Sequence, residues 1–475
     1  IPTAINELIK NAHDAYADNF DIDFFRYDNL LILRDNGLGM TKDEFETRWL
    51  TLGTESKLSG STLSMPPIDP GKPKRAIMGE KGIGRLAIAS IGSQVLIVTK
   101  SKTAGDSAKV VVAFINWGIF ELPGINLEDI VIPVVEFDEL PTSEDINMIT
   151  NEVISSLTSL YDKNLISHGD YTRIRTEIKS FDVNPYELSN LLYGSYPMST
   201  NNGGTHFYIS PVYETLISDI EGDGSSEEAT KMEKMLMGFH NTMTPNHPKP
   251  VVDIAFRDYR SSDGSFVSII DKDHFFTPDE FELADHHIQG EFDQYGQFKG
   301  TIRIYGEKSY AHIINWRDNN YRETECGPFK INLAYLQGEL KSSRVDIENY
   351  AMIRAKGDKF GGLYIYKDNI RVLPYGDSDY DFLDIEKNRS KRASTYFFSY
   401  RRMFGAIDIT NNQNAGLVEK AGREGFIENK AYRQLQAILK NFFIQLAADF
   451  FDDKKGTPQS EFYIQKKNEL NTYHK

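Results

Sequence analysis

Five features follow one another in the first 210 residues, and their order restricts the fold more than any one of them alone. They are an amphipathic segment (4–18), a β-type run ending in DNGLG (35–39), a Ser/Gly/Pro-rich segment (51–75), the loop GEKGIG (79–84) and Gly-Thr in a later β-type run (204–205). Helices and strands alternate here without βαβ regularity. We therefore expect an α+β sandwich.

The first amphipathic segment, AINELIKNAHDAYAD, carries two different faces. At about 100° per residue, Glu7, Asn11 and Asp14 fall within about 60° of one another. The apolar residues occupy the other side: Ile5, Leu8, Ile9, Ala12 and Tyr16. The polar line is either a solvated face of a half-buried helix or a designed set of functional groups.

Composition limits the class of protein. A chain of 475 residues with 40% apolar residues predicts two or three domains with real cores. The single Cys326 and the lack of a long apolar run or signal-like start predict a cytoplasmic protein without structural disulfides or a membrane partner. A net charge of −16 disfavours a surface that coats nucleic acid. Because the chain begins without Met, we expect its natural N-terminus to lie upstream.

The pattern along the chain predicts the elements of a first domain at 1–220. Strands are expected at 20–25, 30–34, 94–100, 108–117, 129–137 and 203–210. Thr41 and Glu44 form a capping-box pattern for a helix ending near Leu50. A further helix is expected at 83–91, a lid at about 51–78, and a helical insert at about 143–193 that includes a helix start at Asn184-Pro185.

A second domain is expected after a polar, acidic linker. The stretch EGDGSSEE (221–228) opens a linker and connecting helix at 221–250. Strands at 251–257 and 300–306, a hairpin at 361–376 and a closing helix at 429–451 place an α+β domain at 251–475.

The glycine loop is the first candidate for chemistry. Gly79, Gly82 and Gly84 precede a helix, where free backbone N–H groups and the helix dipole favour an anion. A tight turn would use the same residues. The loop lacks the Lys-Ser/Thr ending of a P-loop and no dinucleotide-type βαβ unit surrounds it, so neither of those enzyme classes is supported.

Taken together, the ordered features resemble the GHKL superfamily, named for gyrase, the ninety-kilodalton heat-shock chaperone, histidine kinases and MutL. The matching stretches cover roughly residues 1–210. The resemblance implies the Bergerat ATP-binding fold, with ATP and Mg²⁺ bound across the face of a sheet. It implies that Asn11 ligates Mg²⁺ and that Glu7 is the general base for attack on the γ-phosphate, with Asp14 positioning neighbours or the lid.

The same resemblance implies roles for the loops. Asp35 would accept the adenine amino group, Gly37, Gly39 and Met40 would lie close to the base, and Thr205 would support Asp35 through a hydroxyl or a water. The triphosphate would lie in the loop formed by Gly79, Lys81, Gly82, Ile83 and Gly84, and Lys81 is alternatively a solvated charge. Thr54, Ser56 and Lys57 would serve the lid or the phosphates.

The second domain is similar, in patches, to the transducer or middle domain of these proteins. The stretch EKAGREGFIENKAYRQL resembles the segment from which an Arg or Lys reaches the γ-phosphate, which implies Arg423 as a catalytic cation with Lys420 as substitute. A surface salt bridge is the alternative for Arg423. The basic and aromatic stretch 387–402 either contacts nucleic acid or an acidic partner, or is a helix with a solvated basic face and buried aromatic residues.

These expectations describe a lid-gated ATPase that forms a homodimer on binding ATP. No phosphoacceptor His helix is recognised, which disfavours a histidine kinase. MORC-like and chaperone-like prokaryotic ATPases fit the glycine loop and the Arg423 stretch best, which is compatible with antiphage defence or DNA handling. A client-binding chaperone, a nucleotide-gated scaffold and a topoisomerase subunit stay open as alternatives.

Overall fold

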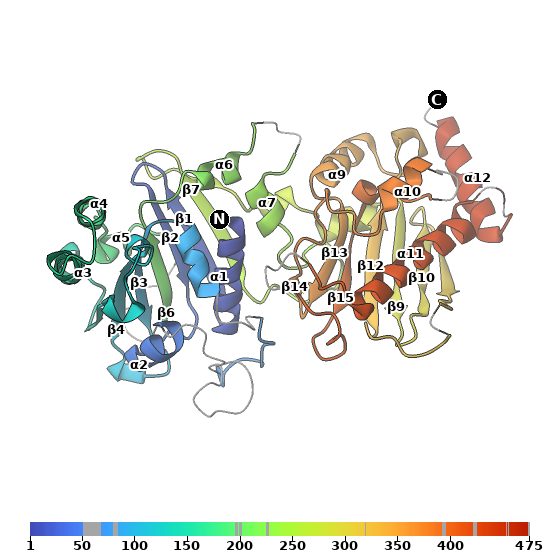
Figure 1. The fold of residues 1–475 in the computed structure, drawn as a ribbon. Coiled ribbons are helices and arrows are strands. Elements are labelled where there is room, and N and C mark those ends of the chain that lie inside the picture. The colour runs from blue at the N-terminus through green and yellow to red at the C-terminus, as the bar shows by residue number, and fades with distance from the viewer. Residues whose placement is uncertain are drawn as a thin grey trace. The chain divides into compact units, whose positions relative to one another are not determined.

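The computed structural model divides the chain into two compact units, and each contains its own mixed sheet (Figure 1). Unit 1 comprises residues 1–221 and 251–270, and unit 2 comprises residues 222–250 and 271–475. The structure describes residues 1–50, 68–78, 84–194, 198, 202–224, 228–318, 320–391, 396–420, 425–452, 454 and 456–473. Both units contain helices and strands, which confirms the α+β expectation.

In the described part of unit 1, eight strands form one sheet in the order β5-β4-β3-β6-β2-β1-β7-β8. All neighbours are antiparallel except β1 and β7, which run parallel. The strands are β1 (Asn19–Phe25), β2 (Leu30–Asp35), β3 (Gln94–Lys100), β4 (Val110–Asn116), β5 (Val134–Phe137), β6 (Gly204–Ile209), β7 (Asp253–Tyr259) and β8 (Val267–Ser268).

Helices cover both faces of this sheet. Side chains from α3 (Ser143–Asp162) and α4 (His168–Lys179) form one core with Leu30 and Ile32 of β2. Successive strand residues point to opposite faces, so Leu31, Leu33 and Asp35 belong to the other face. In Figure 1, α1 (Pro2–Asp14) lies on the side of the sheet away from α3 and α4. Unit 1 also contains α2 (Lys42–Glu44), α5 (Pro185–Leu188) and α6 (Thr215–Glu221).

Most local expectations for unit 1 are confirmed. Thr41 and Glu44 make the predicted capping box, and the chain continues as a π-helical turn (Phe45–Leu50). The side chain of Asn184 caps α5. Two expectations were wrong in type or length: 84–90 is a 3₁₀ helix (η2, Gly84–Ser90), and the strand expected at 129–137 begins only at Val134.

The domain boundary differs from the expected one. The strand expected to open the second domain at 251–257 is β7, which pairs with β1 along its whole length, from Asn19 opposite Asp253 to Phe25 opposite Tyr259. The segment 222–250, which was expected to be a linker, belongs to unit 2 and contains α7 (Lys231–Leu236). Local sequence patterns identify a strand but do not identify its partner, which is why this boundary was misplaced.

In the described part of unit 2, seven strands form a sheet in the order β11-β10-β9-β12-β15-β13-β14, and only β13 and β15 run parallel. The strands are β9 (His286–Phe292), β10 (Phe298–Ile304), β11 (Lys308–Ile314), β12 (Phe329–Tyr335), β13 (Gly362–Lys367), β14 (Ile370–Arg371) and β15 (Met403–Ile409). The helices are α8 (Pro278–Leu283), α9 (Ile347–Phe360), α10 (Ile385–Lys391), α11 (Lys430–Phe450) and α12 (Pro458–Tyr473).

The predicted closing helix is α11, and its apolar stripe packs on this sheet. Leu435, Leu439, Phe442 and Leu446 are buried with side chains from β9, β10 and β12. The stripe therefore supplies core. No described helix combines the length and apolarity needed to cross a bilayer.

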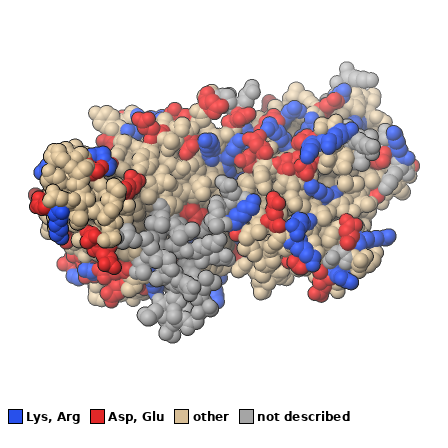
Figure 2. All heavy atoms as spheres, in the orientation of Figure 1, with Lys and Arg blue, Asp and Glu red and all other residues tan. Residues whose placement is uncertain are grey.

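The basic and aromatic stretch at 387–402 separates into two environments. Phe398 and Tyr400 are buried in the core of unit 2, and Phe397 packs against it. The basic residues of α10 lie at the surface, whereas residues 392–395 are outside the described part. The expected burial of the aromatic residues is confirmed, although they follow α10 and do not lie on one helix with its basic residues. On the face drawn in Figure 2, Lys and Arg are interspersed with Asp and Glu.

Candidate functional site

The first helix is buried on its apolar face and buried or half-buried along its polar line. Pro2 occupies the first turn of α1, and Ile5, Leu8 and Ile9 are fully buried. Glu7 is only 8% exposed, although it lies on the polar line. Asn11 and Asp14 are half-buried. The polar line is therefore not a solvated face.

The 3₁₀ helix that follows the glycine loop packs against α1. Gly84 is its first residue, and the fully buried Ile88 lies further along it. This contact brings the end of the glycine loop next to the helix that carries Glu7 and Asn11. Residues 79–83 of the loop itself lie outside the described residues.

Asp35 is the most strongly perturbed carboxyl group of this region. It ends β2, opposite Thr205 of β6, and is 6% exposed. Burial raises its pKa to about 6, although the backbone N–H groups of Gly37 and Thr205 and the charge of Lys102 oppose the rise. The Gly37 N–H donates to Asp35 Oδ1 at 2.8 Å. The result is a buried acceptor that is mostly ionised at neutral pH.

Two glycines after Asp35 make a turn that has no space for side chains. A Cβ at Gly37 would lie 2.7 Å from the carbonyl oxygen of Ala15. Gly39 has φ +63°, and a Cβ there would lie 1.8 Å from the carbonyl oxygen of Lys100. The Leu38 N–H donates to Ala15 O at 2.8 Å. The turn therefore lies tightly between the end of α1 and β3, as the DNGLG pattern requires.

Thr205 is held by a residue that the sequence did not single out. Its hydroxyl lies 3.0 Å from the hydroxyl of Thr99 in β3, which also bonds to Gly204 O at 3.0 Å. The Met40 N–H donates to the same Thr99 hydroxyl at 3.1 Å. Thr99 thus joins Met40 to the strand that carries Thr205. No local pattern marked it, because β3 is uniformly buried and only its pairing with β6 brings the two hydroxyls together.

Asp14 contacts the segment that leads into the glycine loop. Its Oδ1 accepts a hydrogen bond from the Met78 N–H at 2.8 Å, and His13 Nδ1 lies 3.3 Å away. Met78 immediately precedes Gly79. The positioning role expected for Asp14 has a direct structural counterpart in this bond.

Two basic residues attach the same segment to the end of α1. Arg75 Nη1 donates to the carbonyl oxygens of Ala17 at 2.8 Å and His13 at 3.1 Å. Lys72 Nζ donates to Tyr16 O at 2.8 Å. Cations at a helix C-terminus satisfy free carbonyl groups and complement the helix dipole. The sequence pattern did not identify either residue, since both lie in a segment without periodicity.

Several expected site residues lie outside the described residues. They are Thr54, Ser56, Lys57, Gly79, Lys81, Gly82, Ile83 and Arg423. Lys420 is exposed in unit 2, and its backbone N–H donates to Gly425 O at 2.9 Å. Among the described residues, no group of three or more His, Cys, Asp or Glu side chains is arranged to hold a metal ion. Asn11, the one residue expected to ligate Mg²⁺, has an amide oxygen, which is a hard ligand of the kind that Mg²⁺ prefers.

The N-terminal part of the chain matches a family of known proteins. Residues 1–130 match the family described as Histidine kinase-, DNA gyrase B-, and HSP90-like ATPase. This match supports the GHKL superfamily. It covers α1, the Asp35 turn and the glycine loop, and it supports ATP binding and hydrolysis at the level of that superfamily.

The sequence was also compared with curated proteins, and the fold with solved structures. No curated protein matches the sequence. Among solved structures, an N-terminal domain of a DNA repair protein is similar over 94% of this chain and 95% of its own, with 10% sequence identity and a TM-score of 0.43.

Proposed function

We propose that unit 1 binds ATP together with Mg²⁺ and hydrolyses it. The observation that carries the proposal is Asp35, a buried carboxyl group at the end of a strand, next to a glycine turn without room for side chains. Such a group is costly to bury, and burial outweighs the favourable charge of Lys102 and the backbone bonds that it accepts. It lies within the part of the chain that matches ATPases.

Asp35 recognises the base in this proposal. With a pKa of about 6, it is mostly ionised at pH 7.5 and accepts a hydrogen bond from the adenine amino group. Guanine presents a carbonyl oxygen at that position, which a carboxylate repels. Gly37 and Gly39 allow the backbone to approach the base, and Met40 and Thr205 hold the turn through Thr99.

Glu7 and Asn11 act on the phosphate end. Glu7 takes the proton of the attacking water on its carboxylate, and Asn11 holds Mg²⁺ through its amide oxygen. Bound Mg²⁺ would neutralise charge on the phosphates. Asp14 holds the backbone of Met78, the residue that precedes Gly79 in the sequence.

The remaining expected residues complete the proposed site. The phosphates are surrounded by the glycine loop, with Gly79, Lys81, Gly82, Ile83 and Gly84. The lid contributes Thr54 and Lys57. The cation for the γ-phosphate is Arg423, with Lys420 as substitute. Closure of the lid and ATP-dependent homodimerisation then couple the nucleotide to the second unit. A MORC-like clamp in antiphage defence or DNA handling is the role we assign, with a chaperone acting on protein clients or a weakly hydrolysing scaffold as the alternative.

The binding test compares three forms of the full chain in equilibrium titrations with a non-hydrolysable ATP analogue and Mg²⁺. Asp35→Asn places an amide N–H opposite the adenine amino group and is expected to weaken binding at least tenfold, because one charge-assisted bond is lost. The exposed Asp28→Asn is the matched control and should bind as the wild type does. Equal affinity in all three forms refutes the adenine assignment.

The hydrolysis test uses Glu7→Gln, which keeps the shape of the side chain but removes its basicity. Phosphate release should fall by a factor of about 10² or more while binding of the analogue is retained. Unchanged turnover would contradict the assignment of Glu7 as the base.

A further inference from the structure

Unit 2 contains a cavity of about 340 Å³ that the proposed ATPase does not use. It lies between α9, the end of β12 and the turn Tyr400–Arg402 that precedes β15. Its volume is at the lower end of the range typical of small-molecule sites.

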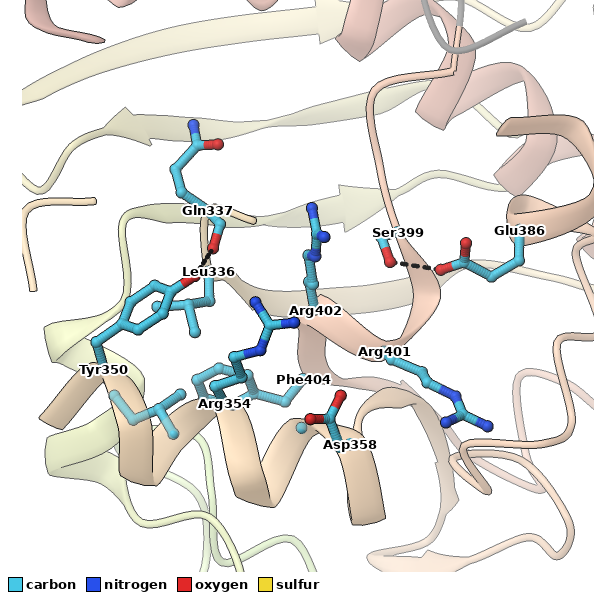
Figure 3. A pocket seen from close by; sticks show the side chains of 12 residues that line it. Leu336, Gln337, Tyr350, Arg354, Asp358, Glu386, Ser399, Arg401, Arg402 and Phe404 are labelled. Atoms are coloured by element: carbon cyan, nitrogen blue, oxygen red, sulfur yellow. Dashed lines mark hydrogen bonds between the residues drawn. The ribbon is translucent and has the colours of Figure 1, made fainter. Parts of the chain in front are cut away.

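Buried side chains give the cavity a fixed apolar wall. Ile353 and Phe404 line it and are almost fully buried. The Phe404 ring stacks on Phe276, with 4.1 Å between the ring centroids. The Tyr350 hydroxyl donates to Gln337 O at 2.9 Å, which ties α9 to the chain after β12 (Figure 3). The cavity therefore has a shape set by the core rather than by loose surface side chains.

Two guanidinium groups meet at Gly338, next to this wall. Arg354 Nη1 donates to the carbonyl oxygen of Gly338 at 3.0 Å. A Cβ at Gly338 would lie 1.8 Å from Arg402 Nη1, so only glycine leaves room for that guanidinium. Figure 3 shows Arg354 and Arg402 extending into the same space, whereas Arg401 points away from them.

The acidic groups near the cavity do not neutralise this pair. Arg401 pairs with Asp379 at 2.8 Å. The Glu386 carboxylate accepts from the Ser399 hydroxyl and from the Tyr400 N–H, the latter at 2.7 Å. Within the described residues, the guanidinium of Arg402 makes no hydrogen bond or ion pair, and that of Arg354 bonds only to Gly338.

Arg402 also acts electrostatically on one carboxyl group near the turn at Gly338. The hydrogen bond and charge of Lys341, followed by the charges of Lys467 and Arg402, lower the pKa of Glu339, and Glu339 pairs with Lys341 at 3.0 Å. Asp358 is the remaining acidic residue that lines the cavity. Among the described residues neither guanidinium group forms an ion pair, and two unpaired guanidinium groups at one cavity favour an anion as their partner.

We propose that this cavity binds the phosphate group of a small phosphate monoester. The guanidinium groups of Arg354 and Arg402 donate to the phosphate oxygens, and the wall formed by Ile353 and Phe404 packs against the organic part. Arginine presents several N–H donors in a planar fork that matches phosphate geometry. Arg354 is exposed and Arg402 is half-buried, so both guanidinium groups can be reached from solvent. The proposal concerns unit 2 alone and does not depend on ATP binding by unit 1.

The test is calorimetric titration of the full chain with two probes, inorganic phosphate and ribose 5-phosphate. Arg402→Gln and Arg354→Gln should each weaken binding of both probes about tenfold, because each removes charge-assisted bonds. Arg317→Gln, at an exposed arginine of the same unit that does not line the cavity, is the matched control and should leave the affinity unchanged. Asp35→Asn should also leave it unchanged, which separates this site from the proposed adenine site.

Two further variants test the sign of the charge and the geometry. Asp358→Asn removes a repelling carboxylate and should tighten phosphate binding. Gly338→Ala displaces the Arg402 guanidinium and should weaken binding, whereas thermal unfolding of the same sample shows whether unit 2 is still folded.

A 5′-phosphorylated oligonucleotide distinguishes the sources of the phosphate. Tighter binding than ribose 5-phosphate, with the same dependence on Arg354 and Arg402, identifies the end of a nucleic acid as the source. Weaker binding identifies a free small ester. The proposal is overturned if none of the probes binds at tens of millimolar, or if binding is the same in both arginine variants as in the wild type.

Discussion

Removing the charge of Asp35 should make the protein more stable while it abolishes the proposed recognition of adenine. Burial raises the pKa of this carboxyl group from 3.8 to about 6. Between those two pH values the folded state holds a proton that the unfolded state has lost, so stability falls as the pH rises through this window. Above pH 6 the destabilisation is complete.

The size of the effect follows from the same two values. A pKa raised by about two units, at about 1.4 kcal/mol for each unit, lowers the free energy of unfolding by about 3 kcal/mol at pH 7.5. The carboxamide introduced by Asp35→Asn keeps an acceptor for the Gly37 N–H but carries no charge. For a unit of this size, 3 kcal/mol corresponds to an increase of roughly 6–12 °C in the midpoint of thermal unfolding.

The assay is differential scanning calorimetry of the nucleotide-free protein between pH 4 and pH 8. Asp35→Asn and the wild type should differ least at pH 4, because the carboxyl group is still protonated in the folded state and, with a pKa of 3.8, only partly ionised in the unfolded state. The variant should gain stability progressively up to pH 6 and keep the gain above it, whereas the control Asp28→Asn should follow the wild type. A variant that is less stable at pH 7.5, or a difference that does not change with pH, refutes the reasoning.

Three further predictions concern packing. Gly39→Ala should destabilise unit 1 by several kcal/mol in urea unfolding, because the new Cβ meets a carbonyl oxygen, whereas Gly124→Ala shares the positive φ but meets nothing and should cost about 1 kcal/mol. Arg75→Ala should increase limited proteolysis within residues 68–78, since the bonds to the end of α1 are lost, and the exposed Lys74→Ala should not. Arg371→Ala should cost unit 2 about 3 kcal/mol or more in chemical unfolding, because its buried guanidinium satisfies three backbone carbonyl groups; unchanged stability would contradict this.

Sequence reasoning succeeded where a local pattern has a local cause. The strand at 94–100, the capping box at Thr41 and the helix start at Asn184 all appear as predicted. Each depends on alternation, a side-chain cap or a proline that acts within a few residues. The buried Asp35 turn belongs to the same class, because DNGLG specifies its backbone conformation.

The site was only partly predictable for the opposite reason. Thr99, Lys72 and Arg75 hold the turn and the loop approach through contacts between segments far apart in sequence. The same is true of the cavity in unit 2, where Arg354 and Arg402 meet at Gly338. Neither arrangement leaves a periodic pattern in the chain.

The sequence by itself determined most elements of unit 1, the order of the nucleotide-site segments and the glycine turn after Asp35, since these depend on backbone conformation and short-range capping. Only the tertiary structure decided that β7 joins the first sheet beside β1, that Glu7 on the polar line of α1 is buried, and which side chains share a cavity. Strand pairing and burial depend on which distant segments meet when the chain folds, and local residue patterns do not encode that choice.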